Sequence, residues 1–327
     1  MDSLPTELLF VIIDLVALDQ YSLAACNRLN KHWHRLTRHL LYKEPKLYRH
    51  SSLEAFLRTV DTPAITQYLS QTGSSTYHRE CLKTAACTEL EIPVGALVQT
   101  IDLSMLPHRW ETVHVGHIQT LVQGCPYIST LNLNGCLLLR DNAVQIIAEQ
   151  LGPRELRSLV LSACNKISDL AVLSICAHAV QVENLELSGC DRLSDISVLE
   201  LGSATVAWAL YDRQRSRWAQ ETQSQDNDND SKENGTTVRG DRVRQSPPVG
   251  ISKSIKSLDL SHCSRITDTG VVGLQRGATQ LSSLNLEGCF GVLMSNVDNE
   301  WEDLSSEGND EYMDNDLDDV SIYNEYH

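Results

Sequence analysis

Aromatic residues are scarce in this sequence: Phe, Trp and Tyr make up 6% of 327 residues, and only 3 residues are Phe. Such a composition disfavours an aromatic stacking platform for nucleic acid. Basic residues are also outnumbered, with 27 Lys and Arg against 43 Asp and Glu, which gives a formal net charge of -16. A negative chain repels a polyanionic partner, so we expect no nucleic acid to bind.

Long hydrophobic runs are missing as well, because nowhere do about 18 apolar residues follow one another. The first apolar run, Leu8 to Ile13, comes after Asp2 and Glu7 and not after the basic region of a secretory signal. We therefore expect no membrane span, a cytoplasmic and/or nuclear location, and ten cysteines in the thiol form.

Patterns typical of catalysis are also absent from the sequence. The 11 histidines are scattered, and there is neither a nucleophile motif nor a Gly-rich phosphate loop. We expect no enzyme activity, no cofactor and no metal site.

A short motif recurs five times, in which two leucines one residue apart are followed by a cysteine. Successive cysteines are 28, 26, 73 and 26 residues apart, so the third interval contains one normal repeat and about 47 extra residues. A weaker copy without cysteine begins at Ile101. The five full copies are Leu131–Cys136, Leu159–Cys164, Leu185–Cys190, Leu258–Cys263 and Leu284–Cys289.

The second half of each unit predicts a helix. An acidic residue stands five positions after each of the first four cysteines, and apolar residues three apart follow it. We interpret Ser168, Ser194 and Thr267, which precede three of these acids, as helix caps. Each unit is therefore expected to be a strand, a tight turn and a helix with one apolar stripe.

These units resemble the cysteine-containing class of leucine-rich repeats over about residues 97–292. The resemblance implies an α/β solenoid with parallel strands on its concave side and helices outside. Thiols one strand spacing apart on buried turns are poorly placed for zinc or disulfides, so we expect buried structural thiols.

Side chains that flank the core leucines should face the concave surface, because side chains alternate along a strand. Eighteen such positions include four acidic residues and no basic one. They form either a client site that favours a basic segment or simply small polar residues that let the strands curve. The candidate client-binding residues are Asp102, Asn132, Glu186, Asp259, Asn285 and Glu287.

Residues 4–48 lie outside the repeat and contain three short apolar-striped segments that predict helices. Pro5 and Glu7 favour a helix start. A unit of about 40 residues is marginal as an independent domain, so we expect it to lean on a partner. Three apolar side chains fall on one face of the first helix: Leu8, Ile12 and Leu15.

This segment resembles an F-box, although a plain helical hairpin with a core tryptophan fits the same residues. The whole chain is similar to fungal F-box/leucine-rich-repeat proteins of the antagonist-of-mitotic-exit type. The matching residues are Leu4, Pro5, Glu7, Ile12, Leu15, Leu23, Trp33 and Leu36. The resemblance implies docking on a Skp1-type adaptor through Leu4, Pro5, Leu8, Ile12 and Leu23.

By this resemblance the chain is expected to be the substrate-recognition subunit of a Skp1-cullin-F-box ubiquitin ligase. The alternative is a non-catalytic regulator that sequesters a signalling partner without ubiquitin transfer. After Cys289 the expected further repeats are missing, so the array is either naturally short or truncated. The expected organisation is an F-box-like unit (1–48), a mostly helical linker (49–96), repeats (97–206 and 254–297), a largely disordered insertion (207–253) and an acidic disordered tail (298–327).

Overall fold

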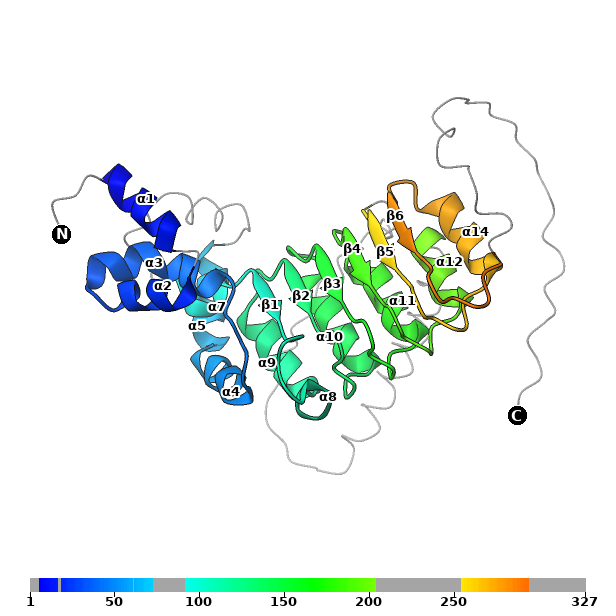
Figure 1. The fold of residues 1–327 in the computed structure, drawn as a ribbon, viewed down its shortest axis with the longest axis horizontal. Coiled ribbons are helices and arrows are strands. Elements are labelled where there is room, and N and C mark those ends of the chain that lie inside the picture. Colours follow the sequence, from blue (N-terminus) through cyan, green and yellow to red (C-terminus); the bar gives the residue numbers. More distant parts are fainter. Residues whose placement is uncertain (1–5, 17–18, 61, 73–91, 204–253, 294–327) are drawn as a thin grey trace, which may run out of the picture. The chain divides into compact units, whose positions relative to one another are not determined.

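The computed structural model describes residues 6–16, 19–60, 62–72, 92–203 and 254–293 (Figure 1). The predicted insertion and acidic tail, and Leu4 and Pro5, lie outside the described residues. The chain divides into two compact units, Met1–Val292 and Leu293–His327. The helices and strands described below belong to the first unit. Among the described helices, none is both long and apolar enough to cross a membrane.

The protein is α/β, with a six-stranded sheet in which every strand pairs in parallel with the next one along the chain (Figure 1). The register repeats without slippage, so that Leu131 lies beside Leu159 and Leu185 beside Leu258. The predicted α/β class and parallel strands are confirmed. The strands are β1 (Thr100–Asp102), β2 (Thr130–Asn132), β3 (Ser158–Val160), β4 (Asn184–Glu186), β5 (Ser257–Asp259) and β6 (Ser283–Asn285).

One helix follows each of the first five strands and packs on the same face of the sheet (Figure 1). Four of these helices begin at the acidic residue that the repeat pattern marks, as predicted. An additional short helix, α8 (Arg109–Thr112), lies between β1 and its long helix. The long helices are α9 (Val115–Gly124), α10 (Asp141–Leu151), α11 (Asp169–His178), α12 (Asp195–Ser203) and α14 (Asp268–Gly277).

A single apolar core runs between the strands and these helices. Both leucines of each motif lie in it, as Leu159 and Leu161 do with no exposed surface, together with the helix stripe residues such as Val172 and Ile175. Full burial of each such side chain contributes about 1.5–3 kcal/mol. A three-residue strand cannot bury its own leucines, so each unit depends on its neighbours.

Three of the helix-start acids bind the neighbouring unit, and the predicted capping is confirmed only for Ser194, whose hydroxyl accepts a hydrogen bond from the backbone N–H of Ile196 at 3.4 Å. Ser168 and Thr267 stand at the N-cap positions of α11 and α14 but make no side-chain cap bond to their own helix. Instead, Asp169 accepts hydrogen bonds from the backbone N–H of Ser194 at 2.8 Å and from its hydroxyl at 2.7 Å. The same pair of bonds joins Asp141 to Ser168 and Asp195 to Thr267.

The cysteines of the motif are buried, as predicted, and four of them form hydrogen bonds with the preceding repeat unit. Each of four thiols donates to a carbonyl oxygen of the preceding unit; for Cys289 the sulfur lies 3.0 Å from the oxygen of Leu260. Burial raises the pKa of Cys136 to about 12 and that of Cys164 to about 11. Both thiols therefore stay protonated at neutral pH, and Cys164 keeps the proton that it donates to the carbonyl oxygen of Leu133.

The N-terminal helices contribute to separate cores. Ile13 and Trp33 make one small core with partly buried Cys26, Leu36 and Leu40. Further along the chain, Leu53, Phe56 and other residues join the core of the repeat array. These helices are α1 (Thr6–Val16), α2 (Gln20–Asn27), α3 (Lys31–Lys43), α4 (His50–Thr59), α5 (Thr62–Thr72) and α7 (Val94–Leu97).

The row of Asp to Ser/Thr bonds should hold neighbouring units together. We expect Asp169→Ala to lower the free energy of unfolding by about 1–3 kcal/mol, because the half-buried N–H of Ser194 loses an ionised acceptor. Urea unfolding followed by far-UV circular dichroism measures the change. Asp191→Ala, at an exposed position outside this row, is the matched control and should change stability little; equal losses in both variants would contradict the role of the row.

Candidate protein-binding surfaces

An apolar face of α1 points to solvent. Among the described side chains of α1, Ile13 enters the small core, on the face opposite Leu8 and Leu15. Apolar residues at spacings of three and four positions lie on one side of a helix. Four of them are 36% to 67% exposed: Leu8, Val11, Ile12 and Leu15. Leu8 and Ile12, two of the predicted adaptor-binding residues, therefore lie on an accessible surface.

Leu23 does not belong to this surface. Its side chain is only 3% exposed on α2, so Leu23 is a core residue in the free chain, and its contact with an adaptor stays a prediction. The physical reason is that α2 packs closely along α3 and turns this leucine inward. Tyr21 and Leu29, which the motif does not mark, are 86% and 60% exposed beside it.

The predicted client residues lie on the sheet face that points away from the helices. Asp102, Asn132, Glu186, Asp259 and Asn285 occupy one register position on five strands, so they form a row across the sheet. Glu287 follows Asn285 by two residues along the chain, just after strand β6. The structure thus brings the predicted residues together.

Most of this row is also engaged in local turns. Asp102 accepts a hydrogen bond from the backbone N–H of Ser104 at 2.8 Å, and Asp259 accepts one from Ser261 at 2.8 Å. The amide oxygens of Asn132 and Asn285 make the same bond two residues on, each at 3.1 Å. Asp and Asn favour such turns because their short side chains reach the backbone. These four side chains therefore stabilise the turn that follows each strand.

Glu186 lies beside Asp259 on the neighbouring strand, so two carboxylates meet in this row. Burial, and secondly the charge of Asp259, raises the pKa of Glu186 above its usual value. Both causes disfavour the ionised form, so the free sheet carries some electrostatic strain at this pair. A cation placed over the two carboxylates would relieve it.

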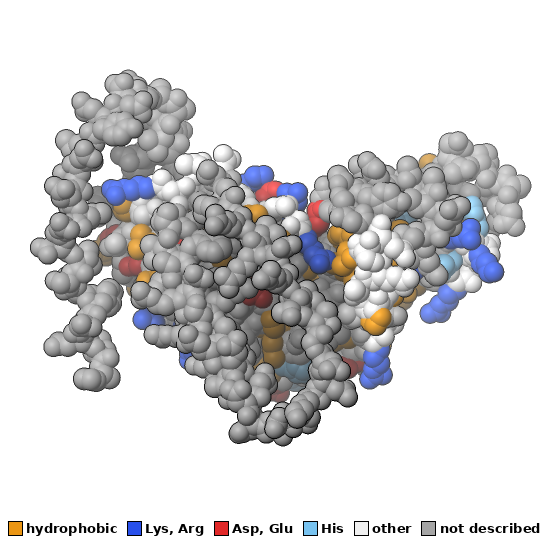
Figure 2. Space-filling model, turned by 180° about the vertical axis from the view of Figure 1, so that it is seen from behind, with side chains coloured by type: hydrophobic (Ala, Val, Ile, Leu, Met, Phe, Trp, Pro, Cys, Tyr) orange, Lys and Arg blue, Asp and Glu red, His pale blue; other side chains and the backbone are white. Residues whose placement is uncertain are grey.

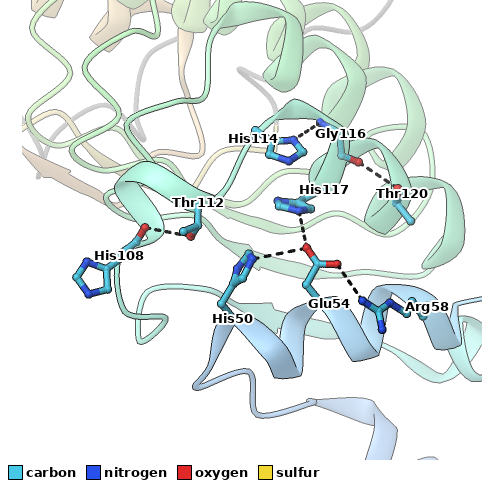
Figure 3. Close-up of polar contacts among 9 residues, drawn as sticks. All are labelled: His50, Glu54, Arg58, His108, Thr112, His114, Gly116, His117 and Thr120. Atoms are coloured by element: carbon cyan, nitrogen blue, oxygen red, sulfur yellow. Dashed lines mark hydrogen bonds and ion pairs between the residues drawn. The ribbon is translucent and has the colours of Figure 1, made fainter.

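A cluster of three histidines and one glutamate connects α4 to α9 (Figure 3). Glu54 Oε1 lies 3.2 Å from His117 Nε2 and 3.6 Å from His50 Nε2. The ring of His114 stacks on that of His117 at 3.8 Å, and its Nδ1 accepts a hydrogen bond from the N–H of Gly116. Within the part of the chain that the structure describes, no group of His, Cys, Asp or Glu is arranged to hold a metal ion.

Protonation of His117 is unfavourable. The side chain of His117 is 12% exposed, and its Nδ1 is buried without a hydrogen-bond partner among the described residues. Burial and the neighbouring His114 lower the pKa of His117, against a smaller opposing effect of Glu54. The sequence offered only a weak signal for this cluster, namely His50 and Glu54 four residues apart and His114 and His117 three apart, in segments 60 residues away from each other.

The two kinds of acidic residue on the sheet should respond differently to truncation. We expect Asp259→Ala to lower the free energy of unfolding by about 1 kcal/mol, because the N–H of Ser261 loses its acceptor. Glu186→Ala should leave stability unchanged or slightly raise it, since it removes a carboxylate from a repulsive pair. Urea unfolding of both variants checks this, and a larger loss from Glu186→Ala would contradict the assignment.

Stability should fall as the pH drops below about 6.5, the pKa of an unfolded-state histidine. Because the folded-state pKa of His117 is lower, the unfolded chain binds more protons in this window, and unfolding is favoured. The free energy of unfolding, measured from pH 7.5 to 5.5, should decrease less steeply in His117→Gln than in the wild type. An identical dependence of the free energy of unfolding on pH in the two proteins would show that protonation of His117 is not coupled to folding.

No family model and no curated protein matches this chain. Among solved structures, a chain in the crystal structure of the Rad7 and Elc1 complex in yeast is similar over 80% of this chain and 84% of that chain, at 12% identity and a TM-score of 0.22. A TM-score this low does not demonstrate a common fold.

Proposed function

We propose that the chain is the substrate-recognition subunit of a Skp1-cullin-F-box ubiquitin ligase, with an N-terminal F-box and a leucine-rich-repeat solenoid. The observation that carries the proposal is the apolar outer face of α1, where Leu8, Val11, Ile12 and Leu15 are turned to solvent. Exposed apolar side chains that are contiguous on one helix mark a surface for a partner. The adaptor is the partner that the F-box resemblance implies.

The repeat array supports the second part of this proposal. Six strands in unbroken register present a row of side chains on the face that the helices leave open, and five of the six are polar or acidic, with Val160 on β3 as the exception. A rigid sheet of this kind can contact an extended protein segment over several strands at once. The client proposed for this face is a protein with a basic segment, which the paired carboxylates of Glu186 and Asp259 would attract.

No chemistry is assigned to the chain itself. Buried cysteines such as Cys136 and Cys164 have raised pKa values, which makes them poor nucleophiles, and four of the motif cysteines donate hydrogen bonds within the core. In the proposed complex, the chain would hold its client near a ubiquitin-transferring enzyme bound to the cullin. Its contribution to the reaction would be proximity.

Adaptor docking can be tested by placing charge on the outer face of α1. Replacing both Leu8 and Ile12 by Asp should weaken binding of a purified Skp1-type adaptor at least about 100-fold, because two apolar anchors are lost. The far-UV circular dichroism spectrum should stay unchanged, since both side chains are exposed in the free chain. Pull-down and calorimetric titration measure the loss.

A matched control is available on the repeat helices. Leu170 and Ile196 are exposed by 38% and 53%, and replacing both by Asp makes the same chemical change far from α1 in the sequence. This control should bind the adaptor like the wild type. Undiminished binding by a folded Leu8/Ile12 variant would contradict the docking site. A wild-type chain that retains a protein client without adaptor or cullin would favour the sequestering regulator instead.

A further inference from the structure

The repeat array ends differently on its two sides. Before β1, the N–H of Gln99 donates a hydrogen bond to the carbonyl oxygen of Lys43 at 2.9 Å, and Val98 and Ile101 have no exposed surface. On the other side, β6 is the last strand, and no further helix or strand follows it in the part of the chain that the structure describes. Leu284 on β6 is only partly buried, unlike the equivalent residues of the five earlier strands. The C-terminal end of the sheet is therefore open.

Backbone hydrogen bonds between neighbouring units repeat at fixed positions up to this end. The N–H of the second core leucine donates to a carbonyl oxygen of the next unit in five units, from Leu103 to Leu260, at 2.8 or 2.9 Å. The N–H two residues further on makes a bond of the same kind in four units, from Gly135 to His262, at 2.7 or 2.8 Å. In the last unit the corresponding donors are the N–H groups of Leu286 and Gly288. Neither has an acceptor among the residues that the structure describes.

The acceptors of this ladder end in the same way. Two residues before the first core leucine, one carbonyl oxygen of each earlier unit accepts two N–H groups of the next unit; these oxygens belong to Gln99, Ser129, Arg157, Glu183 and Lys256. The equivalent oxygen of Ser282 accepts no hydrogen bond from a described residue. We call the outward side of residues Ser282 to Gly288 the β6 edge. It offers two donors and one acceptor, in the arrangement with which each earlier unit binds another strand.

The β6 edge lacks the features that keep strand edges from pairing. Natural proteins protect an open edge with Lys, Pro or a bulge, because unpaired N–H and C=O groups bind another chain readily. Between Ser282 and Gly288 there is no Lys, Arg or Pro. Phe290, two residues after this stretch, is 87% exposed and adds apolar surface at the same end of the array. The β6 edge therefore favours pairing with an extended segment.

Charge indicates which kind of segment fits the β6 edge. Glu287 is exposed there, and the 34 residues that follow Leu293 contain 12 Asp and Glu and no Lys or Arg. Figure 2 shows Lys, Arg and His side chains gathered over the N-terminal helices, at the other end of the array. A second copy of the chain would bring a second acidic run and be repelled, whereas a basic segment would be attracted.

We propose that the β6 edge binds an extended, basic segment of a partner protein, which joins the sheet as an additional strand. Side chains alternate along a strand, so partner residues beside Leu284 and Leu286 would point to the core, and those beside Asn285 and Glu287 to the open face. The matching segment therefore alternates apolar residues with Lys or Arg. This inference goes beyond the proposed function, because it concerns the edge of the sheet and needs no adaptor.

The test uses the full chain and a fluorescein-labelled peptide in which valine and lysine alternate, with binding measured by fluorescence anisotropy. The N–H of Leu284 points to the same side as that of Leu286, because backbone groups alternate along a strand. Leu284→Pro removes this outward N–H, which an edge strand tolerates, and should weaken peptide binding at least about 10-fold. Leu284→Val keeps the N–H and is the matched control, with a loss below about 2-fold.

Changes in the peptide keep the result interpretable if the proline variant folds poorly. The peptide is N-methylated either at every valine or at every lysine, and only one of the two sets of amides can face β6. One methylated peptide should therefore lose binding to the wild-type chain while the other keeps it.

The charge preference is tested separately. Glu287→Lys should weaken binding of the unmethylated peptide at about 50 mM salt, and less so at about 500 mM, where charges are screened. Glu111→Lys, an equal change of charge at an exposed position on α8, is the control and should bind like the wild type.

Three results would overturn the inference. The first is equal binding of both methylated peptides, or equal binding by a folded Leu284→Pro variant and the wild type. The second is a wild-type dimer in sedimentation equilibrium that Leu284→Pro converts to a monomer, because a second copy would then occupy the edge. The third is slow hydrogen exchange at Leu286 and Gly288 in the free monomer, because another segment of the chain would then cover the edge. Failure of adaptor binding would end the proposed function and leave this inference standing.

Discussion

Stacking in exact register is the constraint on which the rest of the molecule depends. Each unit offers one three-residue strand and one short helix, and neither can bury its apolar face without a neighbour on both sides. Core leucines, cysteine thiols and helix-start aspartates all reach into an adjacent unit. Register also explains why β4 pairs with β5 across more than 50 intervening residues: the units on either side still match, as Leu185 beside Leu258 demonstrates.

The periodic features of this chain could be predicted from the sequence because they repeat. Strand positions, parallel order, buried cysteines and the acidic helix starts follow from one motif that occurs several times. The partner of each acid could not be predicted in the same way. A Ser or Thr before a helix resembles a cap, and only the packed structure reveals that Asp169 binds Ser194 of the next unit. The repeat pattern identified the acidic residues but not the side chains of the next unit that they bind.

Non-periodic features were predictable only in part. Leu15 and Leu23 both match a loose apolar motif, yet one is exposed and the other buried, because α2 packs on α3 and α1 has an outer face. The histidine cluster joins α4 to α9 across more than 60 residues, so no local pattern predicts it. On the open sheet face, Asp259 serves its own turn while Glu186 does not, a distinction that side-chain spacing alone cannot make.

In the proposed account, two surfaces divide the work: the helices α1 to α3 engage the ligase, and the sheet face engages the client. The most direct measurement is affinity purification of the tagged full chain followed by quantitative mass spectrometry. The account predicts a Skp1-type adaptor and a cullin in near-equal amounts with the chain, together with at least one client. Recovery of a client with neither adaptor nor cullin would contradict it.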